Sequence, residues 1–147
     1  MNAIKPTLGS AGFTLIEIMV VVVILGILAA IVAPNIIGRV EQARVTRAKT
    51  DIQTIEAALK MYRIDNSRYP TTEQGLEALV RKPAGANLPK YTPDGYLEKL
   101  RKDPWGSPYQ YLFPGQNGRL DIYSFGADGM PGGAENDADI GNWNLDE

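Results

Sequence analysis

The sequence contains neither cysteine nor histidine among its 147 residues. Without cysteine, the chain can form neither a disulfide nor a zinc site with thiolate ligands. Without histidine, it lacks the most common general base and the most common metal ligand of proteins. These absences remove the residues on which most enzyme mechanisms depend, and we predict that the chain is not an enzyme.

The sequence also lacks a concentration of positive charge. It has 15 Lys and Arg against 17 Asp and Glu, for a net charge of −2. The basic residues are dispersed among the acidic ones, and no cluster of aromatic and arginine residues forms a platform for bases. Nucleic acid is therefore not an expected partner. The length allows one domain of modest size beside the long apolar run described next.

One long apolar run occupies residues 13–33, and Glu17 is its only charged residue. A helix of that length is about 30 Å long, which matches the hydrocarbon thickness of a bilayer. We predict a transmembrane and assembly helix over 13–33. Residues 34–147 then form the amphipathic continuation of the helix and a globular domain.

Glu17 is out of place in this run, because an ionised carboxylate in hydrocarbon costs several kcal/mol unless it is paired or protonated. Two interpretations stay open: the side chain lies at headgroup depth in water, or a cation meets it. Only Lys5 precedes the run, and no Lys or Arg follows before Arg39. A cation for Glu17 therefore comes from a chain terminus or from another subunit.

The leader ends in Ser10-Ala11-Gly12, and Phe13-Thr-Leu-Ile-Glu17 opens the apolar run. This order closely resembles the type IV prepilin signal. The resemblance implies a leader peptide over 1–12, cleavage after Gly12 and methylation of Phe13 by a prepilin peptidase/N-methyltransferase. It also implies that Glu17 pairs with the Phe13 amine of a neighbouring subunit and sets their register. A secretory signal peptide has a shorter apolar core, and a plain membrane anchor does not require this motif.

Membrane orientation is a point on which two criteria disagree. Arg39, Arg44, Arg47 and Lys49 follow the run, whereas only Lys5 precedes it. The positive-inside rule therefore favours a cytoplasmic C-terminal part. The resemblance implies a periplasmic C-terminal domain, and we follow it because a leader that is cut on the cytoplasmic side keeps Lys5 inside.

Beyond the apolar run, Pro34 is expected to kink or locally unwind the helix and not to end it. Apolar residues then recur at steps of three and four up to Tyr62, with Ala48, Ile52, Ile55 and Leu59 among them. This periodicity predicts an amphipathic helix whose apolar stripe packs on a domain of the same chain. A coiled-coil partner is the alternative.

The remaining segments predict a small α+β domain. Thr71 and Gln74 form a capping-box pattern that predicts a short helix to about Arg81. A surface loop over 82–93 and a turn over 103–108 follow, and Trp105 in that turn is interpreted as a core residue. Two strands, 109–113 and 119–125, are joined by a hairpin loop over 114–118. Leu120 and Ile122 alternate with Arg119, Asp121 and Tyr123, as in a half-buried sheet.

A glycine-rich stretch over 125–143 concentrates four acidic residues, Asp128, Glu135, Asp137 and Asp139. Their mutual repulsion favours a solvated, irregular loop unless a cation is bound. Calcium accepts six to eight oxygen ligands in flexible geometry, which suits carboxylates mixed with backbone carbonyls. The spacing is not that of an EF-hand. Both interpretations, an acidic solvated loop and a calcium site, stay open on the residues alone.

The chain as a whole resembles the G pseudopilins, the major pseudopilins of type II secretion systems. The segments that carry the resemblance are the leader, 61–80, 103–112, 121–129 and 137–143. It implies a type IV pilin-like fold, with a long N-terminal helix on a small antiparallel sheet and a C-terminal loop that binds calcium. The implied ligands are Asp128, Asp137, Asp139 and the carbonyl of Phe125, with the carbonyls of Met130 and Glu135 as further candidates.

The resemblance also implies the function. The chain is expected to be a single-pass protein of the bacterial inner membrane that leaves the lipid and polymerises into a periplasmic pseudopilus, which drives export of folded exoproteins across the outer membrane. Expected partners are other copies, minor pseudopilins and the inner-membrane platform. Type IV pilus subunits share the helix but commonly close their last loop with a disulfide, which this chain cannot form.

Two further functions are alternatives to the filament subunit. The first is a monomeric, membrane-tethered binding module that depends on calcium, for which replacing Glu17 by Ala leaves function intact. The second is a membrane-anchored hydrolase that uses paired carboxylates such as Asp128 and Asp137. Both acids lie on one glycine-rich loop without a partner base, which argues against the hydrolase.

Overall fold

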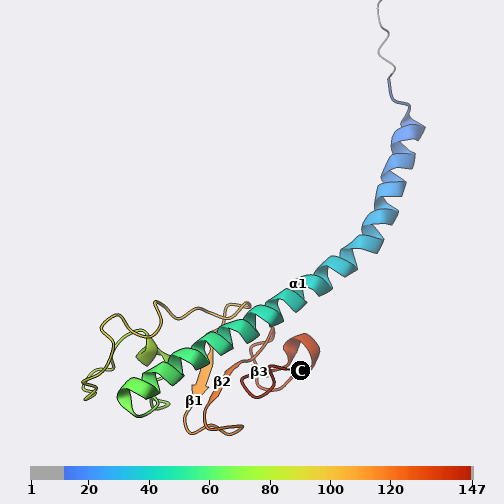
Figure 1. The fold of residues 1–147 in the computed structure, drawn as a ribbon. Coiled ribbons are helices and arrows are strands. Elements are labelled where there is room, and N and C mark those ends of the chain that lie inside the picture. Colours follow the sequence, from blue (N-terminus) through green and yellow to red (C-terminus); the bar gives the residue numbers. More distant parts are fainter. Residues whose placement is uncertain (1–11, 147) are drawn as a thin grey trace, which may run out of the picture. The chain divides into compact units, whose positions relative to one another are not determined.

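The computed structural model describes residues 12–146, and for residues 33–37 it describes the backbone alone. The chain divides into two units, one ending at Arg39 and one comprising Val40–Glu147, and each is considered by itself. A single helix, α1 (Leu15–Asn66), contributes to both units (Figure 1). The leader with Lys5, Ser10 and Ala11 lies outside the described residues.

The backbone of α1 is helical through Pro34. The prediction that the helix continues past Pro34 is therefore confirmed. Of the two forms expected at Pro34, a kink or a locally unwound stretch, the unwound stretch is absent. A proline removes one helical hydrogen bond, and a long helix can continue through it with a local kink.

In the second unit, α1 packs on the rest of the chain through one stripe of its surface. The stripe consists of the buried residues Ala48, Ile52, Ile55, Ala58, Leu59 and Tyr62. Their spacing of three and four places them on one face, where strands, loops and a short helix of the same chain cover them. The prediction that this stripe packs on its own domain is confirmed.

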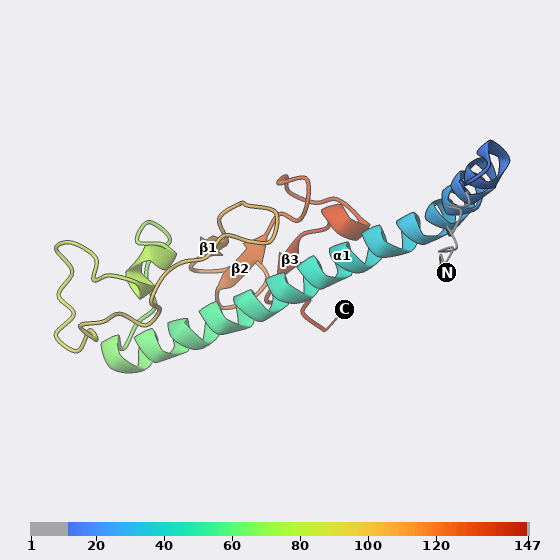
Figure 2. The ribbon, with the colours of Figure 1, turned by 90° about the horizontal axis from the view of Figure 1, so that it is seen from above.

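The sheet has three antiparallel strands in the order β1-β2-β3, namely β1 (Gln110–Leu112), β2 (Asp121–Ser124) and β3 (Ile140–Gly141). Tyr111 pairs with Ile122, and Ser124 pairs with Ile140. The sheet lies along the second half of α1 (Figure 2). The predicted hairpin is confirmed with shorter strands. The third strand was not predicted, because two residues in a Gly- and Asp-rich segment give no periodic signal.

The predicted alternation in the second strand is half right. Leu120 and Ile122 are buried, but Asp121 is buried as well. Its carboxylate accepts hydrogen bonds from the backbone N–H groups of Gln116, Asn117 and Gly118 in the hairpin loop. Asp121 points inward although the alternation predicts an outward-facing side chain, because its carboxylate satisfies the N–H donors of a tight loop.

The capping pattern at Thr71 and Gln74 forms as predicted: the Gln74 N–H donates to Thr71 Oγ1, and the Thr71 N–H donates to Gln74 Oε1. The short helix predicted after it is present as the 3-10 helix η1 (Leu76–Leu79), which begins after a set of turns and ends before Arg81. Gly75 explains the late start of this helix. Its φ of 59° lies in the left-handed region and interrupts a right-handed helix.

The segment 82–93 forms neither helix nor strand, but it is not simply a surface loop. Leu88 is buried in the core, and the Tyr91 hydroxyl donates to the carbonyl of Ala78. Trp105 packs against the core and donates from Nε1 to Glu41, in agreement with its predicted role. Tyr96, Leu97 and Leu100 also pack on the core, as do the rings of Tyr109 and Tyr111.

Candidate functional site

The first candidate site is the apolar half of α1. The segment Leu15–Val32 is long and apolar enough to cross a membrane, and none of it is buried by the described part of the chain. Its large side chains are exposed on all sides, from Leu15 at 78% to Val32 at 50%. An apolar surface of this extent has to be covered by lipid or by other protein.

Glu17 lies in the first turn of this helix and forms a capping box with Thr14. The Glu17 N–H donates to Thr14 Oγ1 at 3.3 Å, and the Thr14 N–H donates to Glu17 Oε2 at 3.4 Å. The acid also stands at the positive end of the helix dipole. The sequence analysis missed this role, although Thr14-x-x-Glu17 before an apolar run is its usual signal.

Gly12 and Phe13 lie just before the helix and are exposed. A Cβ atom at Gly12 would meet nothing within 4 Å among the described residues. The Phe13 ring is 77% exposed. No packing contact in the described residues therefore requires a glycine at position 12 or a phenylalanine at position 13. An interaction with another molecule is the remaining explanation for these two residue types.

The second candidate site is the loop between β2 and β3, which contains η2 (Glu135–Asp137). Backbone hydrogen bonds join its two arms: the Ala127 N–H donates to Asn136, and the Asp139 N–H donates to Gly132. Gly126 and Gly133 have positive φ, and a Cβ at Gly133 would collide with the carbonyl of Asp137. Glycine is required at both positions because the two arms approach so closely.

The predicted metal ligands lie in different parts of this loop. Asp128 Oδ1 accepts a hydrogen bond from the Met130 N–H, and Asp139 Oδ2 accepts one from the Gly132 N–H. Phe125 directly follows β2, and its ring packs against Tyr123 with centroids 5.2 Å apart. Within residues 12–146, no three carboxylates are gathered into one metal-binding cluster. The structure therefore does not assemble Asp128, Asp137 and Asp139 as a set.

Asp139 nevertheless fits a hard cation. Its Oδ1 atom is buried and has no hydrogen-bond partner among the described residues. A buried carboxylate oxygen without a partner is costly, and an oxygen-seeking cation is one way to satisfy it. Carboxylate oxygens are ligands that calcium prefers in proteins, so Asp139 has the chemistry of a calcium ligand.

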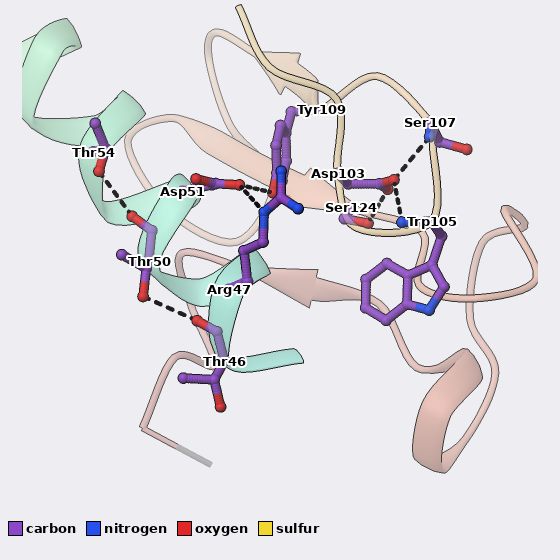
Figure 3. A network of polar contacts seen from close by, with 10 residues as sticks. All are labelled: Thr46, Arg47, Thr50, Asp51, Thr54, Asp103, Trp105, Ser107, Tyr109 and Ser124. Carbon is purple, nitrogen blue, oxygen red and sulfur yellow. Dashed lines mark hydrogen bonds and ion pairs between the residues drawn. The ribbon is translucent and has the colours of Figure 1, made fainter. Parts of the chain in front are cut away.

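The base of the loop is held by Asp103, which the sequence analysis did not single out. Its Oδ1 accepts hydrogen bonds from the N–H groups of Trp105 and Ser107, and its Oδ2 accepts one from the Ser124 hydroxyl at 2.6 Å (Figure 3). Ser124 in turn accepts a hydrogen bond from the Gly126 N–H at the start of the loop. Asp before Pro-Trp-Gly-Ser is an Asx-turn signal that could have identified this residue.

A partly buried polar contact ties the residue before β1 to α1. The Tyr109 hydroxyl donates to Asp51 Oδ2 at 3.0 Å, and Arg47 lies 3.6 Å from the same oxygen (Figure 3). Burial, together with the negative charge of Asp51, holds the pKa of Tyr109 well above its usual value. Burial likewise raises the pKa of Tyr111, whose hydroxyl donates to the carbonyl of Pro70.

Comparisons with known proteins agree with this architecture. Residues 35–143 match the family model described as type II secretion system (T2SS), protein G, and residues 8–33 match the prokaryotic N-terminal methylation motif. The type II secretion system core protein G of Pseudomonas aeruginosa is 66% identical over 134 residues, covering 90% of this chain and 94% of that protein. The core protein G of Vibrio cholerae is 57% identical over 136 residues, covering 92% and 93%.

A solved structure gives the same result. The crystal structure of the major pseudopilin from the type 2 secretion system of enterohaemorrhagic Escherichia coli matches with a TM-score of 0.65 and 49% identity, covering 75% of this chain and 91% of that one. The long helix on a small antiparallel sheet is thus a pseudopilin fold, as the sequence predicted. The chain belongs to the protein G family of type II secretion systems.

Proposed function

We propose that this chain is the major structural subunit of the pseudopilus of a type II secretion system and acts through assembly, without catalysis. One observation carries the proposal: the described part of the chain leaves the apolar half of α1 uncovered, whereas it buries one stripe of the other half. A helix of this kind needs lipid before assembly and neighbouring helices after it. The match to a major pseudopilin supports a filament of many copies.

The N-terminal residues fit processing by a prepilin peptidase. The methylation motif covers residues 8–33 and therefore includes Gly12 and Phe13. Cleavage after Gly12 frees the amine of Phe13, and Glu17 is the acid available to neutralise such an amine on a neighbouring copy. Pairing a buried acid with a buried amine specifies register between helices more than it adds stability.

The proposed location follows from the helix and the leader. The chain is inserted in the bacterial inner membrane by residues 13–33, with its globular unit in the periplasm. Minor pseudopilins and the inner-membrane platform of the secretion system are the proposed partners. Growth of the filament moves folded exoproteins toward the outer membrane.

We propose calcium as the ion of the β2–β3 loop. Asp139 is its central ligand, because its Oδ1 is buried without a partner in the described part of the chain. Asp128, Asp137 and the carbonyl of Phe125 complete the proposed oxygen set, with the carbonyls of Met130 and Glu135 as further candidates. The bound ion would neutralise acidic side chains and order the loop.

The deciding experiment is the mass and N-terminal sequence of the mature protein, followed by assembly of a Glu17→Ala variant. We expect loss of residues 1–12 and one added methyl group on Phe13. We also expect Glu17→Ala to be inserted and folded normally but to form no filaments. Thr14→Ala is the matched control, because it removes the capping partner and keeps the acid. Wild-type filament yield from Glu17→Ala would refute the proposed role of Glu17, and an intact leader would refute the processing.

A further inference from the structure

We propose that the C-terminal end of α1 carries a docking surface for the acidic C-terminal segment of a second copy of this chain. We call this surface the arginine hollow. It is a depression of about 550 Å³ lined mainly by Arg63, Ile64, Arg68, Tyr69, Phe113 and Arg119. The inference rests on the proposed filament function and adds a specific contact between globular units.

The three arginines of the hollow have no acidic partner in residues 12–146. The ion pairs found there use Arg44, Arg47, Lys60 and Arg81 instead. The Arg63 guanidinium carbon lies 5.3 Å from the centre of the Tyr69 ring, so a cation–π contact holds it in place. Three arginines that line one hollow, with one of them over an aromatic ring, suit carboxylates, which arginine binds in a bidentate manner.

Exposed apolar side chains accompany these charges. In the described part of the second unit, the exposed large apolar side chains other than Val40 are Met61, Ile64, Met130 and Trp143. Ile64, 74% exposed, lines the hollow, and Met61, 61% exposed, lies one helical turn before it. Arginine, aromatic and Met side chains are the types enriched in protein interfaces.

Met130 and Trp143 both belong to the acidic segment, which comprises residues 121–147. This segment contains no Lys or Arg, and its acidic residues are Asp121, Asp128, Glu135, Asp137, Asp139, Asp146 and Glu147. A bound calcium ion would offset only two of these charges. The segment therefore complements the hollow in charge and, through Met130 and Trp143, in apolar surface.

The β2–β3 loop of the acidic segment and the hollow lie at opposite ends of the second unit. Asp121, where the segment begins, is buried in β2 near the hollow and is not part of the proposed contact. Figure 2 shows the loop with η2 beside the beginning of this unit's part of α1, whereas the hollow is at the helix's C-terminal end. From Glu41 to Arg63 the helix rises by roughly 30 Å at 1.5 Å per residue. A chain cannot place its acidic loop in its own hollow. Contact between the two different surfaces is head-to-tail, and repeated contacts of this type build an open filament.

Two non-glycine residues in the described part of the chain have positive φ, Ser67 at 60° and Glu135 at 54°. Ser67 directly follows the last residue of α1, where a residue in the left-handed region commonly ends a helix. Glu135 begins η2 in the acidic loop, and its side chain is exposed.

The first test uses the absence of native cysteine. One full-length chain carries Ile64→Cys and a second, differently tagged, carries Met130→Cys, and the two are assembled together in membranes that contain the secretion apparatus. A short bismaleimide is expected to link the two chains in filaments and not in unassembled protein. Thr54→Cys, at another exposed position of α1, replaces Ile64→Cys as the matched control and is expected to give no link. Equal linking by both variants would overturn the proposal.

The second test reverses charges across the contact. Arg68→Glu and Glu135→Lys are each expected to reduce filament yield by about tenfold, because like charges then face each other. The two changes in one chain are expected to restore assembly, since every contact regains opposite charges. Arg81→Glu, outside both surfaces, is the control. Thermal unfolding of each full-length variant in detergent checks that it remains folded.

The outcomes separate the inference from the proposed function. If the wild-type chain forms no filaments, the filament function itself fails. If the wild type assembles and Arg68→Glu assembles equally well, only the arginine hollow is refuted as a contact between copies. If Arg68→Glu filaments form normally but export stops, the hollow binds the exported protein and the assignment to a second copy is wrong.

Discussion

The two halves of α1 are both rich in Leu, Ile, Val and Ala but differ in what covers these side chains. In the first half Leu25 is 59% exposed, whereas in the second half Ile52 and Leu59 are fully buried. The second half buries one stripe and exposes polar residues elsewhere, while the first half is apolar on all sides. The single buried stripe of the second half suits packing on a domain, and the all-round apolar surface of the first half suits lipid or a bundle of helices.

The two halves therefore differ in what determines their surroundings. The second half is specified by the chain itself, because strands, loops and η1 fill the space over its stripe. The first half is specified only to be apolar and of membrane length, and its final environment depends on other molecules. Changes in the second half should therefore affect folding, and changes in the first should affect assembly.

The largest effect is expected from Leu59→Ala. The side chain is fully buried, so its truncation removes apolar contacts and leaves a cavity. We expect the free energy of unfolding of the globular unit to fall by about 2–5 kcal/mol. Denaturant unfolding of the full-length protein in detergent, followed by circular dichroism and Trp fluorescence, measures it.

Leu25→Ala is the matched control, with the same change in the first half of the helix. Because Leu25 is exposed, we expect a change within about 0.5 kcal/mol in the unfolding of the globular unit. Equal destabilisation by the two variants would break the comparison, since it would mean that the chain covers both halves of its helix.

The next effect concerns calcium. If the ion binds through Asp139, free calcium at about one hundred times its dissociation constant should stabilise the globular unit by about 2.7 kcal/mol. Thermal unfolding with calcium and with a chelator measures the difference. Asp139→Asn should abolish it, whereas Asp94→Asn, at an exposed position outside the loop, should retain it. Identical unfolding curves for the wild type in both conditions would exclude the site.

Features that depend on periodicity could be predicted from the sequence. The apolar run, the stripe from Ala48 to Tyr62 and the hairpin all follow from the spacing of side chains, and the structure has all three. Glu17 was singled out as an isolated acid, but its capping bond to Thr14 was overlooked. Thr14-x-x-Glu17 before an apolar run is a capping-box pattern, so this local partner could have been predicted from the sequence.

Features that depend on long-range satisfaction of polar groups could not be predicted in the same way. Asp121 was expected to face solvent because strand residues alternate, yet the hairpin loop supplies donors that make its burial favourable. The Ser124 hydroxyl bonds to Asp103 from another segment, which no local pattern reports. The ligand set proposed for calcium depends on how the two arms of the β2–β3 loop meet. The sequence indicates acidic residues there and not their arrangement.

The smallest effect that we expect is a dependence of stability on alkaline pH. Burial and Asp51 raise the pKa of Tyr109, so Tyr109 stays neutral in the folded protein when an unfolded tyrosine ionises at about pH 10. Above that pH the unfolded chain binds fewer protons, and stability falls as pH rises. Tyr109→Phe should lose about 1 kcal/mol at neutral pH and show a shallower alkaline decline, which Tyr111 keeps from vanishing. Residues 13–33 contain no tyrosine, so this response belongs to the globular unit alone. An unchanged slope in Tyr109→Phe would show that Tyr109 is not the group that titrates.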